Sequence, residues 1–361
     1  MDITGRSDRK DDMDKYTEKE PVLRSFNEKE VREGIKTGLS LRNQIESIID
    51  RIWEEGFDGI WFIGIGGTYA SCMQAEVYMR GRSSLPVFAD NAAEFLTTGN
   101  KRFSSGSVVI LSSVSGTTDE MVRLVRCVKE KGARVFSFID TPGSLMTQEN
   151  MYDFLVVSPK NEQLKFYEAC NYLMYKNGEF PDYAHYCAMM EEHLADALVM
   201  VEKEADAWGK ETARSLSEFI QTHPDYPHYF IGSGNLYGTA YSHAMCYWEE
   251  QLWIRTKSIS CQEFFHGCLE IVVKDTPVTL LVGEDEQRPL ALRVAAFLPK
   301  VCENYRIIDT KEYALEGIDP EYRGTISHLV VRAVLNRLDA YMEYYLQHPM
   351  TIRRYYRQME Y

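Results

Sequence analysis

An apolar run that ends in closely spaced glycines occurs twice in the chain, and this repeat constrains the fold more than any other feature. The first run, GIWFIGIGG, covers 59–67, and the second, HYFIGSGN, covers 228–235, about 165 to 170 residues later. Each run is typical of a buried strand that leads into a tight turn. The recurrence indicates two structural units and favours an internal duplication.

Each glycine turn is followed by alternating helical and apolar stretches. The expected helices are 68–80, 119–131 and 239–253, and the expected further strands are 107–112, 133–139, 277–282 and 305–308. Strand, turn, helix and strand in this order predict parallel strands joined by right-handed crossovers. We therefore predict an α/β fold with two doubly wound parallel-sheet units in tandem.

The rest of the chain is predicted to be helical or irregular. One helical pattern covers 27–55, a long stretch without strand signals links the units, and a last helix over 327–347 ends before His348-Pro349. Residues 1–25 are expected to be a loosely held arm. The predicted division is an N-terminal arm and helix (1–45), a first unit (46–165), a helical linker (166–217), a second unit (218–325), and a C-terminal helix and tail (326–361).

Composition and charge exclude several classes of function. The formal net charge of -14 argues against general binding to nucleic acid, which needs clustered cations. The chain has no uninterrupted apolar stretch of about 18 residues and no secretory signal at its start, so a cytoplasmic protein is expected. The eight cysteines are scattered, without a CxxC pair or a His/Cys cluster at ligand spacing, so reduced thiols and no metal site are predicted.

The stretch 112–118, with sequence SSVSGTT, is the strongest candidate for ligand binding. It contains five hydroxyl residues in seven and lies between an expected strand and an expected helix whose first turn holds Asp119 and Glu120. Such a turn offers free backbone N–H groups, hydroxyl donors and the positive end of a helix dipole, and Gly116 lets the backbone approach an anion closely. No lysine follows as in a P-loop, so the sequence favours a phosphorylated sugar over a nucleoside triphosphate.

The first glycine turn is less specific. Its GxGG pattern lacks the third glycine of a dinucleotide-binding turn, because Tyr69 occupies that position. We expect this turn to close one wall of the sugar-phosphate pocket, and no organic cofactor is predicted.

Glu250 and His266 are the candidate catalytic pair. Glu250 lies near the end of the helix expected over 239–253, and His266 follows sixteen residues later, directly before a glycine. A carboxylate and an imidazole are the groups that sugar ring-opening and proton transfer between adjacent carbons require.

Together, the SxSGxT turn, the second glycine-ended strand and the Glu-to-His-Gly spacing resemble the sugar isomerase (SIS) domain proteins. Within them the chain is most similar to the fructosamine-6-phosphate deglycases, on the stretches 263–272, 281–288 and 353–361. Cys268 stands where that family usually has proline. The tail lacks the lysine with which the related synthases form a Schiff base, which favours a deglycase.

The resemblance implies site residues by position. Glu250 matches the catalytic glutamate and His266 the ring-opening histidine, which in this family commonly reaches a neighbouring subunit, so a homodimer or higher homo-oligomer is implied. The implied phosphate contacts are Ser113, Ser115, Gly116, Thr118, Gly67 and Thr68. Further candidates for substrate contact are Ser112, Gly66, Lys165 and Arg354.

The implied reaction converts a 6-phosphorylated fructosyl-amino acid and water into glucose 6-phosphate and the free amino acid, through an enaminol and an imine. The aromatic residues Trp248, Trp253, Phe264 and Phe265 are expected to desolvate the glutamate, which would raise its pKa toward working pH. Two alternatives remain at this point. One is an aldose–ketose isomerase or deaminase acting on glucosamine 6-phosphate, and the other is a non-catalytic sugar-phosphate sensor.

Overall fold

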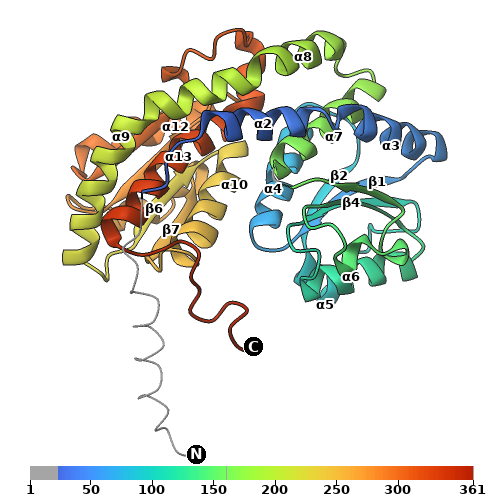
Figure 1. The fold of residues 1–361 in the computed structure, drawn as a ribbon, viewed down its shortest axis with the longest axis horizontal. Coiled ribbons are helices and arrows are strands. Elements are labelled where there is room, and N and C mark those ends of the chain that lie inside the picture. The colour runs from blue at the N-terminus through green and yellow to red at the C-terminus, as the bar shows by residue number, and fades with distance from the viewer. Residues whose placement is uncertain (1–22, 160, 361) are drawn as a thin grey trace, which may run out of the picture.

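The computed structural model of the protein describes residues 23–159 and 161–360 and contains two parallel sheets. The first has the order β2-β1-β3-β4-β5 and the second β7-β6-β8-β9 (Figure 1). The strands are β1 (Gly59–Gly64), β2 (Val87–Asn91), β3 (Ser107–Ser113), β4 (Arg134–Ile139), β5 (Phe154–Val157), β6 (His228–Gly232), β7 (Thr256–Ser260), β8 (Val278–Val282) and β9 (Tyr305–Asp309). The predicted fold class is confirmed.

The central strands are buried on both faces, which explains their continuous apolar sequences. In β1, Ile60 and Phe62 pack into one hydrophobic cluster, and the alternate residues Trp61 and Ile63 pack into another on the opposite face. Helices α3 and α7 lie over one face of this sheet and α5 and α6 over the other (Figure 1). A parallel sheet needs such cover on both sides.

The helices that surround the sheets have the following bounds. In the first unit they are α2 (Glu28–Leu39), α3 (Arg42–Glu55), α4 (Gly67–Arg80), α5 (Ala92–Thr98), α6 (Asp119–Glu130), η1 (Leu145–Thr147), η2 (Glu149–Met151) and α7 (Glu162–Lys176). In the second unit they are α10 (Asn235–Ser242), the π-helix η4 (His243–Glu249), α11 (Cys261–Phe264), η5 (Cys268–Ile271), α12 (Arg288–Phe297), η6 (Leu298–Lys300), η7 (Thr310–Glu312) and η8 (Pro320–Tyr322).

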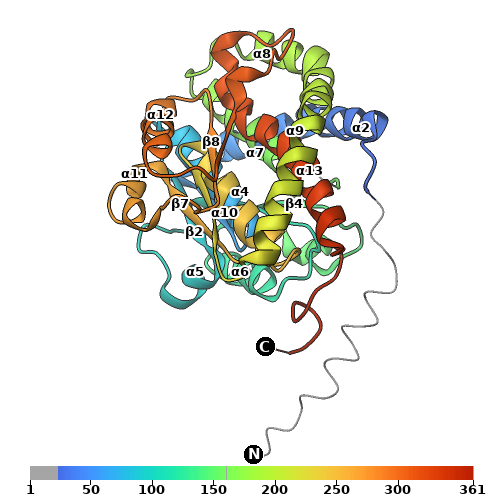
Figure 2. The ribbon, with the colours of Figure 1, turned by 90° about the vertical axis from the view of Figure 1, so that its left-hand side faces the viewer.

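Three helical segments and the last helix join the two units. These are α8 (Tyr183–Met189), the π-helix η3 (Met190–Leu194), α9 (Ala195–Thr222) and α13 (Arg323–Leu346). Helices α9 and α13 lie side by side in both views (Figures 1 and 2). Arg337 Nε of α13 donates to Asp206 Oδ1 of α9 at 2.9 Å. One hydrophobic cluster includes Phe62 of the first sheet and Phe230 of the second, so the two units share a core.

The structure differs from the sequence predictions in three places. The helix predicted over 27–55 is interrupted at Ser40 and Leu41, where the N–H of Ser40 bonds the carbonyls of Lys36 and Gly38 and ends α2. The helix predicted over 239–253 becomes a π-helix after Ser242 and ends at Glu249. Strands β2, β5 and β7 were not predicted, and all three are short edge strands. Most residues of β2 and β7 are only partly buried and carry a weak apolar pattern, whereas β5 is an apolar stretch of four residues in which Phe154 and Val156 are buried.

The nine strands fall within the ranges 46–165 and 218–325 that the sequence suggested for the two units. The exact division of the chain stays a prediction, and residues 1–22 of the expected N-terminal arm lie outside the described residues. Across 23–159 and 161–360, no helix has the length and apolar character needed to cross a membrane.

Candidate functional site

The hydroxyl-rich turn connects the end of β3 to the N-terminus of α6. Gly116 has φ +61, a conformation that bends the chain back so that its N–H bonds Ser113 Oγ at 3.1 Å. Ser115 Oγ accepts the N–H of Thr117 at 3.3 Å and lies 3.4 Å from Thr118 Oγ1. Two hydroxyls and the positive end of α6 therefore meet at one point, which is a favourable place for an anion.

Ser112 differs from its neighbours in the turn. Its side chain is fully buried, and its Oγ donates to Glu162 Oε2 at 2.9 Å. Burial raises the pKa of Glu162, while hydrogen bonds from Ser71 and Ser112 lower it. Ser112 thus belongs to the packing beneath the turn, and Ser115 and Thr118 form its outer surface.

The first glycine turn lies against the second unit. Gly66 has φ +61. Thr68 Oγ1 accepts the N–H of Ile65 at 3.1 Å and donates to the Ile65 carbonyl at 2.9 Å. A Cβ on Gly67 would lie 3.4 Å from Cys246 Sγ in η4. The approach is close because α4 crosses α10 at Gly238, where a Cβ would lie 2.6 Å from the Ala70 carbonyl oxygen.

Glu250 directly follows η4 and lies at the edge of a cavity of about 670 Å³. Its Oε1 accepts Nε of Arg353 at 2.6 Å, and its side chain is 31% exposed. Trp253 and Arg354 also line this cavity, which lies beside the first residue of β7 and just before β6. The carboxylate is therefore both open to a ligand and fixed in orientation by a cation.

The C-terminal tail connects this cavity with the hydroxyl turn. Arg353 pairs with Glu250, and four residues later Arg357 Nη2 donates to Ser115 Oγ at 2.9 Å. Figure 1 shows the tail leaving the end of α13 and running beneath the second unit toward the first. Of the tail arginines, sequence reasoning named only Arg354, as a candidate for substrate contact. The signal available to it was three arginines within 353–357.

Strand β7 lies between Glu250 and His266 in the chain. Glu250 precedes β7, and His266 follows it in the exposed turn between α11 and η5. The five residues of β7 span roughly 16 Å. Cys268 is buried in the apolar cluster under this turn, so the residue that stands in place of proline anchors the segment by packing.

Lys165 and Arg354 lie in different settings. Lys165 is fully buried, and its Nζ donates to Asp140 Oδ1 and to the Ser158 carbonyl, both at 2.9 Å. It joins the ends of β4 and β5 and faces neither solvent nor the cavity at Glu250. Arg354 lines that cavity, with its guanidinium carbon 4.2 Å from the centre of the Trp253 ring.

The aromatic setting predicted for Glu250 is only partly present. Trp253 lines the cavity. Trp248 is fully buried and donates to Asp339 Oδ1 at 3.2 Å. Phe264 and Phe265 pack with Phe297 in the apolar cluster of the second unit. Their contribution to the pocket was overestimated because the sequence gives no indication of which face of the unit they occupy.

The glycine turn of the second unit is filled by the protein's own side chains. Gly234 N–H bonds Gln287 Oε1 at 3.0 Å, and Asn235 N–H bonds Asp285 Oδ2 at 3.1 Å. Burial raises the pKa of Asp285, and the hydrogen bonds that it accepts from the N–H groups of Asn235 and Gln287 oppose that shift. A carboxylate of the chain thus occupies the N-terminus of α10, where an anion would otherwise bind.

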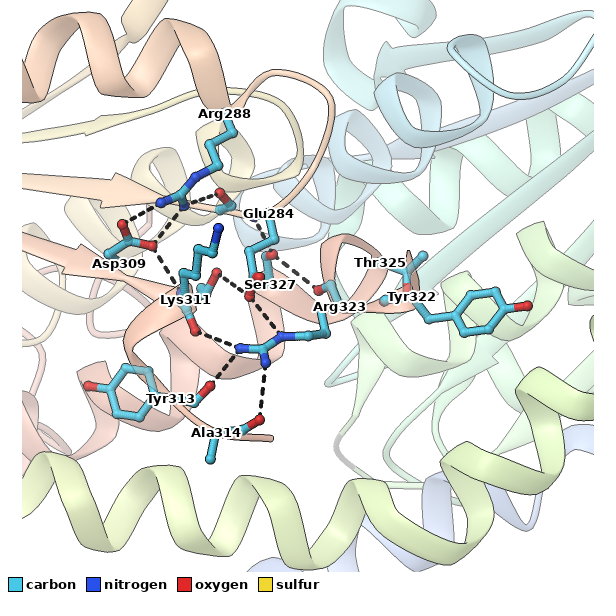
Figure 3. Close-up of polar contacts among 12 residues, drawn as sticks. Glu284, Arg288, Asp309, Lys311, Tyr313, Ala314, Tyr322, Arg323, Thr325 and Ser327 are labelled. Atoms are coloured by element: carbon cyan, nitrogen blue, oxygen red, sulfur yellow. Dashed lines mark hydrogen bonds and ion pairs between the residues drawn. The ribbon is translucent and has the colours of Figure 1, made fainter. Parts of the chain in front are cut away.

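The cations near this second turn are also paired. Arg288 forms a two-pronged ion pair with Asp309 at 2.8 and 2.7 Å, and Arg323 Nε bonds Glu284 Oε1 at 3.1 Å (Figure 3). Such closed pairs stabilise structure and leave few donors for a ligand. The turn of the first unit is therefore the better candidate for anion binding. In the described part of the chain, no group of three or more His, Cys, Asp or Glu residues could hold a metal ion.

Comparison with known proteins finds a family model that matches much of the first unit. Residues 58–174 match the SIS domain. Fructosamine deglycase FrlB of Bacillus subtilis is 26% identical over 333 residues, covering 89% of this chain and 98% of that protein. Fructoselysine 6-phosphate deglycase of Escherichia coli is 23% identical over 314 residues, covering 86% and 89%.

Solved structures agree with the fold. A candidate phosphosugar isomerase of Salmonella typhimurium superimposes with a TM-score of 0.80 at 22% identity, covering 89% of this chain and 99% of that one. A second, from Bacillus subtilis, has a TM-score of 0.74 at 26% identity, covering 85% and 93%. The predicted resemblance is confirmed: the chain contains a SIS domain and is similar to fructosamine and fructoselysine 6-phosphate deglycases over most of its length.

Proposed function

We propose that this protein is a fructosamine-6-phosphate deglycase. It converts a 6-phosphorylated ketose with an amino acid nitrogen on C1, plus water, into glucose 6-phosphate and the free amino acid. The observation that carries the proposal is the C-terminal tail, which contacts Glu250 through Arg353 and Ser115 through Arg357. A base and an anion-binding turn linked in this way suit one substrate with a phosphate at one end and a reacting carbon at the other.

The phosphate end would bind at the turn after β3. Ser115 and Thr118 would donate hydroxyl hydrogen bonds, the N-terminus of α6 would add its partial positive charge, and Arg357 would move from Ser115 Oγ to the phosphate. The backbone at Gly116 would allow close approach of the anion. This end gives affinity and orientation, and the chemistry takes place at the cavity beside Glu250.

The proposed chemistry needs one base that acts on two carbons. Glu250 removes a proton from C1, the C1–C2 double bond forms, and the C2 carbonyl oxygen gains a proton, which gives an enaminol. Glu250 then returns its proton to C2 while the nitrogen lone pair forms the C1 imine. Water adds to C1, the C1–N bond breaks, and the amine leaves with a proton. The substrate nitrogen thus takes the part that a lysine Schiff base plays in other sugar enzymes.

His266 would open the sugar ring in the site of a second copy of the chain. The position of His266 after β7, with Glu250 before that strand, supports this arrangement. The surface near it carries Ile271 and Val273, which are 52% and 53% exposed. Apolar side chains of this exposure beside a polar catalytic candidate favour an interface with another subunit. The proposed assembly is therefore at least a homodimer.

One panel of assays tests the reaction. The protein is incubated with 6-phosphofructosyl-amino acids and, separately, with glucosamine 6-phosphate, and four products are measured: glucose 6-phosphate, free amino acid, fructose 6-phosphate and ammonia. We expect equal amounts of glucose 6-phosphate and amino acid from the first substrates. Fructose 6-phosphate and ammonia from the second would instead favour the deaminase or isomerase. Ligand binding without any product would favour a sensor.

A further inference from the structure

Trp253 has a backbone conformation that is unusual for its residue type. Its φ is +58, in the left-handed region, which costs roughly 1–2 kcal/mol for a residue with a Cβ. Its ring is held on two sides, by the His348 ring at 4.4 Å and by the Arg354 guanidinium at 4.2 Å. Strain of this kind persists where the surrounding structure requires a side chain to face in a particular direction. The direction here is into the cavity beside Glu250.

Arg354 differs in its contacts from the two other arginines that line this cavity. Arg353 uses its donors on Glu250 and on the carbonyls of Met350 and Ile352, at 2.6 to 2.9 Å. Arg255 bonds the Pro224 carbonyl and pairs with Asp225. Among residues 23–159 and 161–360, Arg354 has no hydrogen bond or ion pair, and its guanidinium stacks on the face of Trp253.

Neither acid that lines the cavity forms an ion pair with Arg354. Glu249 Oε1 accepts the Thr256 hydroxyl at 2.6 Å, and Glu250 accepts Arg353. A guanidinium stacked on an aromatic ring keeps the donors along its edge free and in one plane, which matches the two oxygens of a carboxylate. An exposed cation held flat against an aromatic ring in this way, next to the residue that pairs with Glu250, is a site for a carboxylate.

We propose that Arg354 on the Trp253 platform binds the carboxylate of the amino acid attached to C1. This inference rests on the proposed function and specifies its substrate class: ketose 6-phosphates whose C1 nitrogen is the α-nitrogen of an amino acid. In these compounds the carboxylate is attached to the carbon next to that nitrogen. The group that binds it must therefore lie in the same cavity as the base that acts on C1. A lysine linked through its side-chain nitrogen would carry its α-carboxylate beyond this reach.

A matched substrate pair tests the proposal. 6-Phosphofructosyl-glycine and 6-phosphofructosyl-methylamine differ only by the carboxylate. Hydrogen bonds to charged groups contribute about 1.5–3 kcal/mol, so wild-type kcat/KM should favour the glycine compound by about 10- to 100-fold. Arg354→Gln should remove this preference. It should lower kcat/KM for the glycine compound and leave kcat/KM for the methylamine compound unchanged. Arg354→Lys should recover part of it.

The control variant is Arg51→Gln, which removes another exposed arginine stacked on an aromatic ring, Phe154, at 4.8 Å in the first unit. It should change kcat/KM for neither compound. The proposal would be overturned if the wild type had the same kcat/KM for both compounds. It would also be overturned if Arg354→Gln lowered kcat/KM equally for both. Titration calorimetry with the same two compounds measures the preference as affinity and needs no turnover. If neither compound gives products, the proposed deglycase activity is wrong. The ratio of the two affinities tests the carboxylate site at Arg354 independently of that result.

Discussion

Arg353 Nε and Glu250 Oε1 lie 2.6 Å apart, so a residue close to the C-terminus fixes the orientation of the candidate base in the second unit. The same tail reaches Ser115 in the first unit through Arg357. The tail is therefore a structural part of the site, and its removal should affect the base and the anion turn together.

Arg353→Gln should lower kcat for 6-phosphofructosyl-amino acids by about 10- to 100-fold, because a charge-assisted hydrogen bond contributes about 1.5–3 kcal/mol to the position of the carboxylate. Binding of glucose 6-phosphate should change little, since Arg357 and not Arg353 contacts the phosphate turn. Steady-state kinetics and calorimetry give the two readouts. Glu249→Gln, at the neighbouring acid that bonds Thr256, is the control and should retain turnover. Unchanged kcat in Arg353→Gln would contradict the role.

Ser115→Ala should weaken glucose 6-phosphate binding by about tenfold, since a hydrogen bond to a charged group is lost at the phosphate turn. Unphosphorylated glucose should bind both proteins equally weakly. Thr117→Ala is the matched control, because it removes a hydroxyl from the same exposed turn while the oxygens of Ser115 and Thr118 remain. Equal affinity of the wild type for glucose and glucose 6-phosphate would show that the turn does not bind phosphate.

Gly116→Ala should destabilise the first unit by about 2–4 kcal/mol. The left-handed backbone accounts for roughly 1 kcal/mol, and overlap of the new Cβ with Ser144 Oγ, together with its 3.1 Å approach to Ile139 Cγ2, for the remainder. Gly143→Ala is the control: φ is +72 there, but no atom lies within 4 Å of the added Cβ, so only about 1 kcal/mol should be lost. Urea unfolding midpoints measure the loss of stability in both variants. Equal losses would contradict the contribution assigned to the overlap with Ser144 and Ile139.

The fold was predictable because its central strands are buried on both faces and therefore read as apolar runs ending in glycine, as in β1 and β6. The edge strands β2 and β7 are only partly buried, so their sequences carry no such signal. Ser115, Thr118 and Glu250 could be proposed from local pattern and resemblance. The contacts of Arg353 and Arg357 could not, because they join positions separated by 103 and 242 residues and depend on how the tail crosses the molecule.

His328 should make the protein less stable in acid. It is fully buried in α13 on the Tyr167 ring, and burial lowers its pKa from 6.5 to about 3. Between these values the unfolded chain binds a proton that the folded chain does not, so the stability of the folded state falls as the pH falls below 6.5. From pH 7 to pH 5 the loss is about 2 kcal/mol. In His328→Phe the unfolding midpoint should depend less steeply on pH over this range. Part of the slope should remain, because burial also lowers the pKa of His228. An unchanged slope would contradict the assignment.

Mixing two inactive variants tests whether Glu250 and His266 act in the same site from different subunits. Glu250→Gln and His266→Gln should each lower turnover by roughly 10²–10⁴-fold, as expected for loss of a general acid or base. In a mixed dimer, one site combines both substitutions and the other combines wild-type Glu250 with wild-type His266. Random reassociation makes half of the dimers mixed, so activity should recover to about a quarter of the wild-type value.

The recovery should require subunit exchange. It should appear after co-expression or after unfolding and refolding of the mixture, and be absent when the two purified variants are combined without exchange. Glu250→Gln mixed with the double variant Glu250→Gln/His266→Gln is the control, since no dimer in that mixture contains an intact Glu250. No recovery after verified exchange would mean that His266 serves the site of its own chain. The separation of the two residues by the length of β7 would then have to close by a movement within the second unit.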